Sequence, residues 1–257
     1  VTCFHSWKAH PPSFLDNNIL ASFINSSENK LGIVISHGHS DHCDDFFLKR
    51  INNKTPIFFP DYETKGAFNR LKNNNLDNIT LTNSIEEKKF GPFSITSFIN
   101  SEHSNDDAVI IISTDEYILV HANDNSIDFP PELINHILKL GSKNKKTFFA
   151  SQTGIANGFP YSYPQFGANS DLSQMKKTAD EKNTRTIQIA IKNANLVKAN
   201  YFISYAAYTI SLSLLKRFGN KISPLQFLPS PDNLKKLSLN WGDVNLLDYV
   251  PGDTLNL

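Results

Sequence analysis

The sequence predicts an α/β (α+β sandwich) fold in a single domain that spans residues 1–257. Short apolar runs typical of buried strands alternate with longer segments of helical apolar spacing, and this alternation favours sheets covered by helices. Polar, histidine-rich residues also follow directly on one of the apolar runs. Loops after buried strands collect functional residues because a rigid sheet holds them in place.

The individual elements follow from local signals along the chain. Residues 31–36 are predicted to form a strand because they are apolar up to Ser36. Pro131 suits the first turn of a helix that Gly141 ends. The expected strands are 31–36, 56–59, 93–99, 147–150 and 201–204, with 108–113 and 117–121 as a hairpin around 114–116. The expected helices are 45–52, 62–73, 131–140, 172–197 and 212–218.

Composition excludes several classes of partner. The chain has 25 Lys and Arg residues against 25 Asp and Glu residues, so its charge gives no bulk attraction to nucleic acid or to an anionic membrane. No apolar run approaches the roughly 20 residues that a membrane-spanning helix needs. The two cysteines, Cys3 and Cys43, favour a reducing cytoplasm over a disulfide framework. We therefore expect a cytoplasmic protein that binds neither nucleic acid nor membrane.

Three of the eight histidines lie within six residues, in the segment 37-HGHSDH-42. A tight loop can bring His37 and His39 to one point, and Asp41 and His42 then face a second point close by. Metal binding needs several donors converging within about 2.0–2.2 Å of one ion. The pattern HxHxDH after a strand is far more specific than a lone histidine pair, so it predicts a metal site rather than a polar turn.

This segment resembles the signature of the metallo-β-lactamase superfamily. The resemblance implies an αββα sandwich with a one- or two-metal site on its upper edge, completed by a histidine in a later loop and an aspartate after a strand. Both follow in order, in 101-SEHSND-106 and 118-ILVHANDNS-126. By resemblance, the first metal is held by His37, His39 and His103, the second by Asp41 and His42, and Asp124 bridges the two.

One ligand of most two-metal members is missing, because no histidine follows His136. His136 lies inside the helix expected at 131–140 and is predicted to be a helix-surface residue. The second metal is therefore absent, short of one ligand, or completed by His121, Tyr205 or water. Of these, His121 is expected to orient a ligand rather than to bind metal.

Further segments resemble the catalytic portion of CMP-N-acetylneuraminate hydroxylase, a monooxygenase family that acts on a CMP-linked sialic acid. The match spans nearly the whole chain, in the right order. It is carried by 7-WKAHPPSFL-15, 33-IVISHGHSDH-42, 152-QTGIANGFPYSY-163, 201-YFISYAAYTI-210 and 250-VPGDTLNL-257. The resemblance implies hydroxylation of a nucleotide-linked N-acyl sugar with O₂.

The chain departs from that family at its beginning. The family carries an N-terminal Rieske domain, whose iron–sulfur centre uses two cysteines and two histidines. Cys3-x-His5 is half of such a pattern, and no matching Cys-x-x-His exists, so no iron–sulfur cluster is expected in this chain. Few of the residues before His37 look like strands. We therefore expect a C-terminal fragment of a longer protein, which lacks the first strands of the fold and takes electrons from another domain or protein.

Candidate substrate residues lie in the second half of the chain. Gly154 and Gly158 permit a close backbone approach to a ligand. Four tyrosines have hydroxyl groups and rings that suit the binding of sugars and bases: Tyr161, Tyr163, Tyr205 and Tyr208. Alternatively, their side chains belong to the half-buried core and expose only the hydroxyl groups. Three cationic residues of the expected helix could bind a phosphate group: Lys176, Lys177 and Arg185. The favoured interpretation is that they lie on a solvent-exposed face of that helix.

Three functions fit these residues. The favoured one is an oxidoreductase with a mono- or di-iron site, since mixed histidine and carboxylate ligands suit iron. The alternative is a zinc or manganese hydrolase of a phosphoester, lactone or amide, in which the metal lowers the pKa of bound water to near 7. Asp41 and Asp124 are the candidate catalytic residues, because either could orient the attacking water. The third is a metal-stabilised module without catalysis.

Overall fold

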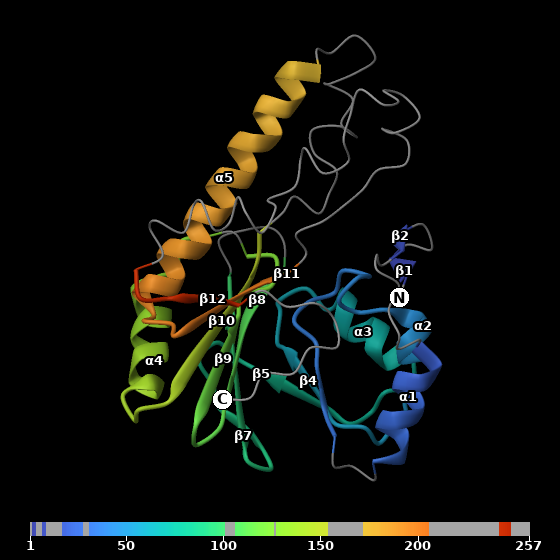
Figure 1. Ribbon diagram of the computed structural model, residues 1–257. Coiled ribbons are helices and arrows are strands. Elements are labelled where there is room, and N and C mark those ends of the chain that lie inside the picture. The colour runs from blue at the N-terminus through green and yellow to red at the C-terminus, as the bar shows by residue number, and fades with distance from the viewer. Residues whose placement is uncertain are drawn as a thin grey trace. The chain divides into compact units, whose positions relative to one another are not determined.

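The computed structural model describes residues 2–3, 7–8, 17–27, 31–100, 106–125, 127–153, 172–205 and 242–247, drawn as coloured ribbons in Figure 1. The chain divides into two compact units. The first comprises Val1–Asp115 with Val250–Leu257, and the second comprises Glu116–Tyr249. These are compact units of the structure, and whether residues 1–257 form the single domain expected from the sequence stays a prediction.

The first unit contains a three-stranded parallel sheet. It consists, in order, of β3 (Ile33–Val34), β4 (Ile57–Pro60) and β5 (Ile79–Thr82). All four residues of β4, the central strand, are buried. The helices of this unit are α1 (Asn17–Ser26), α2 (Asp45–Leu48) and α3 (Gly66–Asn73). Two short strands, β1 (Thr2–Cys3) and β2 (Trp7–Lys8), pair antiparallel at its start.

An antiparallel set of strands completes the first unit. In it, β7 (Phe93–Ile99) pairs with both β6 (Lys88–Phe90) and β8 (Ala108–Ser113). The two sets meet where the Thr82 and Ser97 hydroxyl oxygens lie 2.8 Å apart. One apolar cluster joins them, since Ile57 of β4, Leu71 of α3 and Ile110 of β8 all belong to it. Burial of such side chains away from water stabilises the unit.

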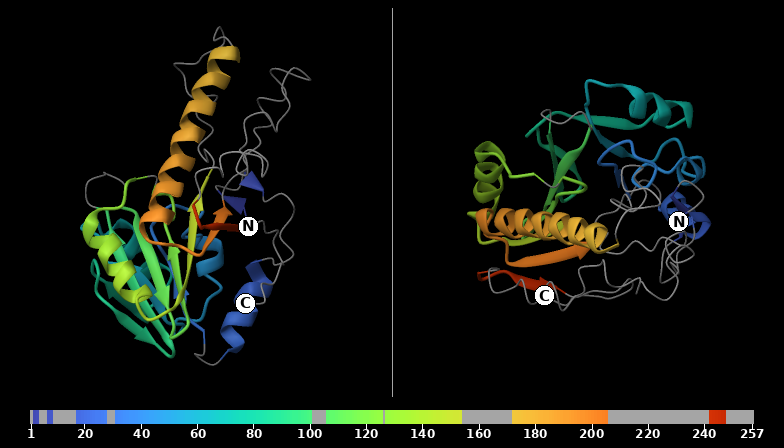
Figure 2. Two further views of the ribbon diagram at one scale, coloured as in Figure 1. Left: turned by 60° about the vertical axis from the view of Figure 1, so that its left-hand side comes forward. Right: turned by 90° about the horizontal axis from the view of Figure 1, so that it is seen from above.

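The described residues of the second unit form a parallel sheet and two helices. Its strands, in order, are β9 (Tyr117–His121), β10 (Lys146–Gln152), β11 (Tyr201–Tyr205) and β12 (Asn245–Leu247). The helices are α4 (Pro131–Gly141) and α5 (Leu172–Leu196). α4 buries Leu133 and Ile137. Figure 2 shows α5, in orange, running beside the strands of this unit and beyond their ends.

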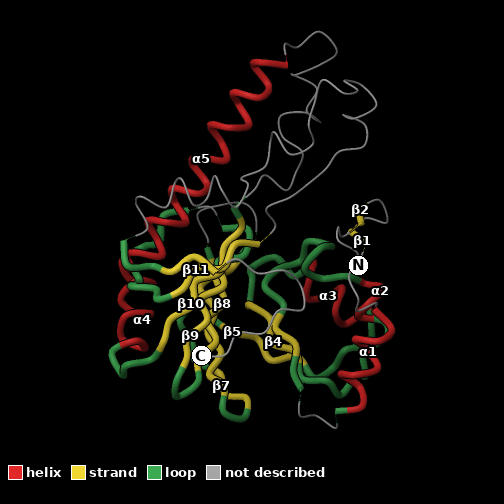
Figure 3. The backbone as a smooth tube through the Cα atoms, in the orientation of Figure 1, coloured by secondary structure: helices red, strands yellow, loops and turns green. Residues whose placement is uncertain are grey.

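Most of the longer predicted elements are confirmed, as the helices and strands in Figure 3 show. Strands β7, β8 and β9 have the expected bounds, and α4, α5, β10 and β11 differ by at most two residues at either end. The elements that the sequence did not predict are short, or poor in strong helix formers, and are α1, β1, β2, β5, β6 and β12. The helix expected at 212–218 lies outside the described residues.

Three predicted elements were too long. The strand expected at 31–36 is reduced to β3, and the helix expected at 45–52 to α2. The helix expected from residue 62 begins only at Gly66. Tyr62 lies instead in a turn, where its backbone N–H donates to the Pro60 carbonyl oxygen at 3.0 Å and its hydroxyl donates to the Ser36 carbonyl oxygen. A tertiary contact has here overridden the local helical pattern.

In the described part of the chain, no helix has both the length and the apolarity that a membrane span requires.

Candidate metal centre

The residues 36–43, which we call the histidine loop, connect β3 to α2. The pairing of β3 with β4 continues to Ile35, whose N–H donates to the Phe58 carbonyl oxygen at 3.0 Å. The chain then turns sharply, because the N–H groups of His42 and Cys43 both donate to the His39 carbonyl oxygen, at 3.0 and 2.8 Å. The loop therefore leaves a half-buried strand and folds back within a few residues, which gathers its side chains.

His37 is at the centre of this gathering. Its side chain is fully buried, and its Nε2 atom lies 2.9 Å from His39 Nδ1. The ring centroids of His37 and His42 lie 4.1 Å apart. The 2.9 Å contact is a hydrogen bond when one of its two nitrogens carries a proton, and the same two nitrogens could share a metal ion when both are unprotonated.

Asp107, a residue that the sequence did not single out, lies behind His37. Its Oδ1 atom is 3.4 Å from His37 Nδ1, and the Ser36 hydroxyl lies 3.0 Å from the same nitrogen. A buried carboxylate at this position favours the proton on Nδ1 and leaves the Nε2 lone pair for a ligand, as the carboxylate partners of metal-bound histidines do. The available signal was weak: an aspartate directly before a buried strand.

Tyr62 supports the start of the loop through its hydroxyl bond to Ser36. The side chain is buried, and this burial, together with the charges of Asp107 and Asp106, raises the pKa of the Tyr62 hydroxyl above its ordinary value. The hydroxyl therefore stays protonated and remains a hydrogen-bond donor at ordinary pH.

The end of the loop is more open. His42 Nε2 lies 3.7 Å from Asp41 Oδ2, and the Asp41 side chain is 44% exposed, so this pair can adjust to a ligand. Cys43 beside it is a buried free thiol, as expected from the sequence. Burial is the main cause that raises the pKa of the Cys43 thiol, so the neutral form persists.

A second loop, residues 122–125, follows β9 and carries Asp124; we call it the Asp124 loop. The Ala122 N–H donates to the Ala150 carbonyl oxygen of β10 at 2.8 Å, and within the loop the Asn125 N–H donates to the Ala122 carbonyl oxygen at 3.1 Å. Asn123 has a φ of +53°, in the left-handed region that asparagine tolerates better than most residues. Gln152 Nε2 donates to the Asp124 carbonyl oxygen at 3.0 Å.

Tyr205 and His121 lie beside this loop. The Tyr205 hydroxyl donates to the Asn123 carbonyl oxygen at 2.7 Å, and its ring stacks on His121 with centroids 4.6 Å apart. The role of orienting a ligand that the sequence predicts for His121 stays a prediction. The proposal that Tyr205 contacts substrate stays a prediction.

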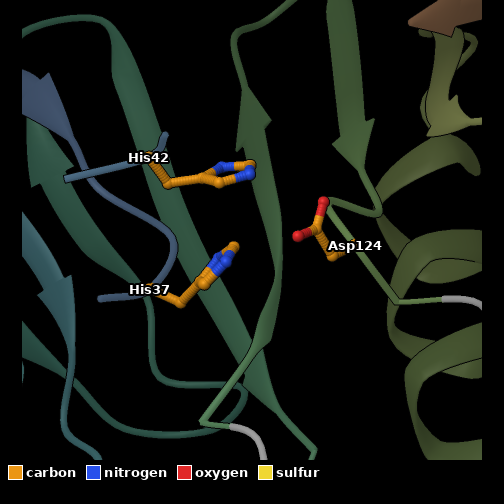
Figure 4. Close-up of side chains that lie close together, drawn as sticks. All are labelled: His37, His42 and Asp124. Carbon is orange, nitrogen blue, oxygen red and sulfur yellow. The ribbon is translucent and has the colours of Figure 1, made fainter. Parts of the chain in front are cut away.

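Figure 4 draws the side chains of three predicted ligands, His37 and His42 of the first unit and Asp124 of the second. Imidazole nitrogens and a carboxylate oxygen are the donors that zinc, iron and manganese accept in proteins. The side chains present therefore fit a metal ion of this class.

Some of the other predicted residues lie on helices of the second unit, and the rest lie outside the described part of the chain. Lys177 extends into solvent, with its side chain 78% exposed and its Nζ atom 3.9 Å from Glu181 Oε1, which supports the solvated helix face expected for the α5 cations. His136 is partly buried on α4. The predicted residues that lie outside the described part of the chain are His103, Gly154, Gly158, Tyr161, Tyr163 and Tyr208.

Comparison with known proteins adds evidence on the fold. No family model matches the sequence, and no curated protein sequence does. Among solved structures, a possible metal-dependent hydrolase from Veillonella parvula is 14% identical with a TM-score of 0.53, over 95% of this chain and 80% of its own. An isothiocyanate hydrolase from Delia radicum gut bacteria is 12% identical with a TM-score of 0.53, and the match covers 99% of this chain and 86% of the hydrolase chain.

A mutant form of the β-hydroxylase CmlA is also similar, at 14% identity and a TM-score of 0.51, over 86% of this chain. CmlA comes from Streptomyces venezuelae. The chain spans 44% of the CmlA chain that it matches. This chain has the metallo-β-lactamase fold. At such identities the likeness shows the fold and leaves the reaction open.

Proposed function

We propose that this chain is the metal-binding part of a metal-dependent enzyme, with an iron-dependent hydroxylase as the first candidate. The observation that carries the proposal is the gathering of histidines in the histidine loop, where His37 Nε2 lies 2.9 Å from His39 Nδ1 and the ring centroids of His37 and His42 lie 4.1 Å apart. The full ligand set that we propose is His37, His39, Asp41, His42, His103 and Asp124. Mixed histidine and carboxylate ligands favour iron, and a bound iron would supply the chemistry that activates O₂.

The roles of the protein's own residues follow from their contacts. Asp107 holds the proton on His37 Nδ1, so that Nε2 remains a ligand. Asp41 and Asp124 would hold or orient a proton near the reacting atoms, because both are acceptors when ionised. The substrate would be a nucleotide-linked N-acyl sugar, bound by Tyr161, Tyr163, Tyr205 and Tyr208. Electrons would come from a donor domain or a separate protein.

A metal-dependent hydrolase is the second candidate, supported by a specific observation. Two of the similar structures, a possible metal-dependent hydrolase and an isothiocyanate hydrolase, cover 95% and 99% of this chain. Zinc or manganese at the same ligands would supply a water of lowered pKa. Asp124 would then orient that water toward a phosphoester, lactone or amide.

Metal identity separates the two candidates. The protein is purified aerobically and anaerobically, and its bound metal and iron absorption band are measured. The hydroxylase predicts iron and O₂-dependent turnover of an N-acyl nucleotide sugar when a chemical or protein reductant is supplied. Zinc alone at full occupancy, with turnover of a model phosphodiester, would reject the hydroxylase in favour of the hydrolase.

Two variants test the common basis of both candidates. Asp124→Asn should abolish turnover and weaken metal binding while the chain stays folded. His136→Gln, on α4, is the matched control and should change neither. If the wild-type protein binds no metal at all, both candidates fail.

A further inference from the structure

Arg70, near the C-terminal end of α3, contacts the histidine loop at both sides of its ligands. A single guanidinium nitrogen, Nη2, donates to the Gly38 carbonyl oxygen at 2.6 Å and to the Cys43 carbonyl oxygen at 2.8 Å. The residues between these two carbonyls include three of the proposed ligands, namely His39, Asp41 and His42. One side chain therefore fixes the distance between the two ends of the ligand-bearing segment.

The guanidinium group is itself held in place. Its Nε atom lies 3.5 Å from Asp45 Oδ1, at the start of α2. Asn74, at the end of α3, donates from Nδ2 to the same Asp45 oxygen at 2.9 Å and to the Arg70 carbonyl oxygen at 2.9 Å. This support restricts the rotamers of Arg70, and a restricted side chain holds the loop more accurately than a free one.

The loop also packs closely on the helix that carries Arg70. A Cβ atom placed on Gly38 would lie 2.5 Å from the Ala67 Cβ atom, closer than real Cβ contacts allow. Gly38 is therefore required by this approach, and the approach brings the loop carbonyls within reach of the guanidinium. Ala67 and Arg70 lie three positions apart in α3, so they share a face of the helix.

We propose that Arg70 is a positioning residue, which sets the geometry of the histidine loop for metal binding; this inference rests on the proposed metal site. Attraction to the metal does not explain its place, because a cation beside a metal-binding loop repels a metal cation. The planar guanidinium, which projects several donors in fixed directions, explains it better than a lysine ammonium would. Arg70 acts through the loop backbone and is not itself a ligand.

The test compares Arg70→Gln and Arg70→Lys with Lys72→Gln, in the full chain. Lys72 lies on the same helix, and its Nζ atom pairs with the exposed Asp77 at 3.6 Å, so it controls for loss of a cation from α3. Co²⁺ and Zn²⁺ affinities are measured by competition with a chelator, and the Co²⁺ absorption spectrum and the unfolding temperature of the metal-free protein are recorded for each variant.

Arg70→Gln is expected to weaken metal affinity about 10- to 100-fold and to shift the Co²⁺ bands, as loss of a residue that orients ligands does. Arg70→Lys should recover only part of the loss, and Lys72→Gln should match the wild type. If Arg70→Gln does not fold, Arg70→Lys decides by the same two measurements. A lower unfolding temperature with unchanged affinity and spectrum would reduce Arg70 to a structural residue and overturn the inference alone. A wild-type protein that binds no Co²⁺ or Zn²⁺ would overturn the proposed function and this inference with it.

Discussion

The histidine loop and the Asp124 loop would present their proposed metal ligands by different means. The histidine loop holds several ligands in a short segment, and side chains from later in the chain support it: Tyr62 at its start, Arg70 across it and Asp107 behind His37. The Asp124 loop presents one carboxylate, and neutral groups hold its backbone, with Tyr205 on the Asn123 carbonyl oxygen.

This difference shows how the number of ligands affects the support that a loop needs. Several donors in one loop must be spaced correctly relative to each other, so the histidine loop needs restraint along its length. A single carboxylate needs only its backbone position fixed, and bonds to the carbonyl oxygens of Asn123 and Asp124 are enough. Changes to the supports should therefore matter more in the histidine loop than in the Asp124 loop.

Loss of a ligand should have the largest effect and tests whether both loops bind the metal. Since loss of a supporting residue already costs about 10- to 100-fold in affinity, His37→Ala and Asp124→Ala should each cost more than roughly 100-fold. Metal affinity is measured by competition with a chelator, with His136→Gln as the control. If only His37→Ala weakens binding, the metal belongs to the histidine loop alone.

Asp107→Asn tests the support behind His37. The amide keeps the shape of the side chain but loses the charge that favours a proton on His37 Nδ1, so metal affinity should fall about 10-fold. Chelator competition detects this fall. Asp77→Asn, at an exposed site, is the matched control. An affinity equal to the wild type would show that the 3.4 Å contact between Asp107 and His37 has no part in metal binding.

Gly38→Ala tests the packing of the histidine loop on α3. The added methyl group would overlap the Ala67 Cβ atom, and such overpacking costs about 1–3 kcal/mol in the free energy of unfolding. Urea unfolding of the metal-free protein measures this cost. Gly66→Ala, where an added Cβ atom meets nothing within 4 Å, should show no comparable loss and serves as the control.

Tyr205→Phe tests the support of the Asp124 loop and should have the smallest effect. The variant keeps the ring that stacks on His121 and removes the hydroxyl, which contacts the Asn123 carbonyl oxygen at 2.7 Å and His121 Nδ1 at 3.5 Å. Each hydrogen bond is worth about 0.5–1.5 kcal/mol in unfolding free energy. Metal affinity should fall less than in Asp107→Asn. A larger fall in affinity for Tyr205→Phe than for Asp107→Asn would reverse the comparison between the loops.

The sequence predicted the ligands in the histidine loop better than their supports. His37, His39 and His42 stand in one short segment, so their pattern is visible without a structure. Tyr62, Arg70 and Asp107 reach the loop from residues 26 to 70 positions away from His37 or its neighbours, through packing that no local pattern encodes.

The helices and strands also differ in how well the local sequence predicts them. Strand β8 was predicted with its bounds because a run of five apolar residues, AVIII, marks it. Helix α1 was missed because its sequence, NNILASFINS, contains asparagine and serine, which are weak helix formers. Its Ala21 and Ile24 nevertheless pack against the core of the first unit, and this packing stabilises the helix.

The central claim is that the histidine loop and Asp124 hold the same metal site. The most direct measurement is a crystal structure of the protein soaked with Zn²⁺ or Fe²⁺, with the metal located by its anomalous signal. The account predicts a peak about 2.0–2.2 Å from His37 Nε2 and from His39 Nδ1, with the Asp124 carboxylate bound to that ion or to a neighbouring one. A peak that lies away from the histidine loop, or one at the loop with Asp124 far from any metal, would contradict it.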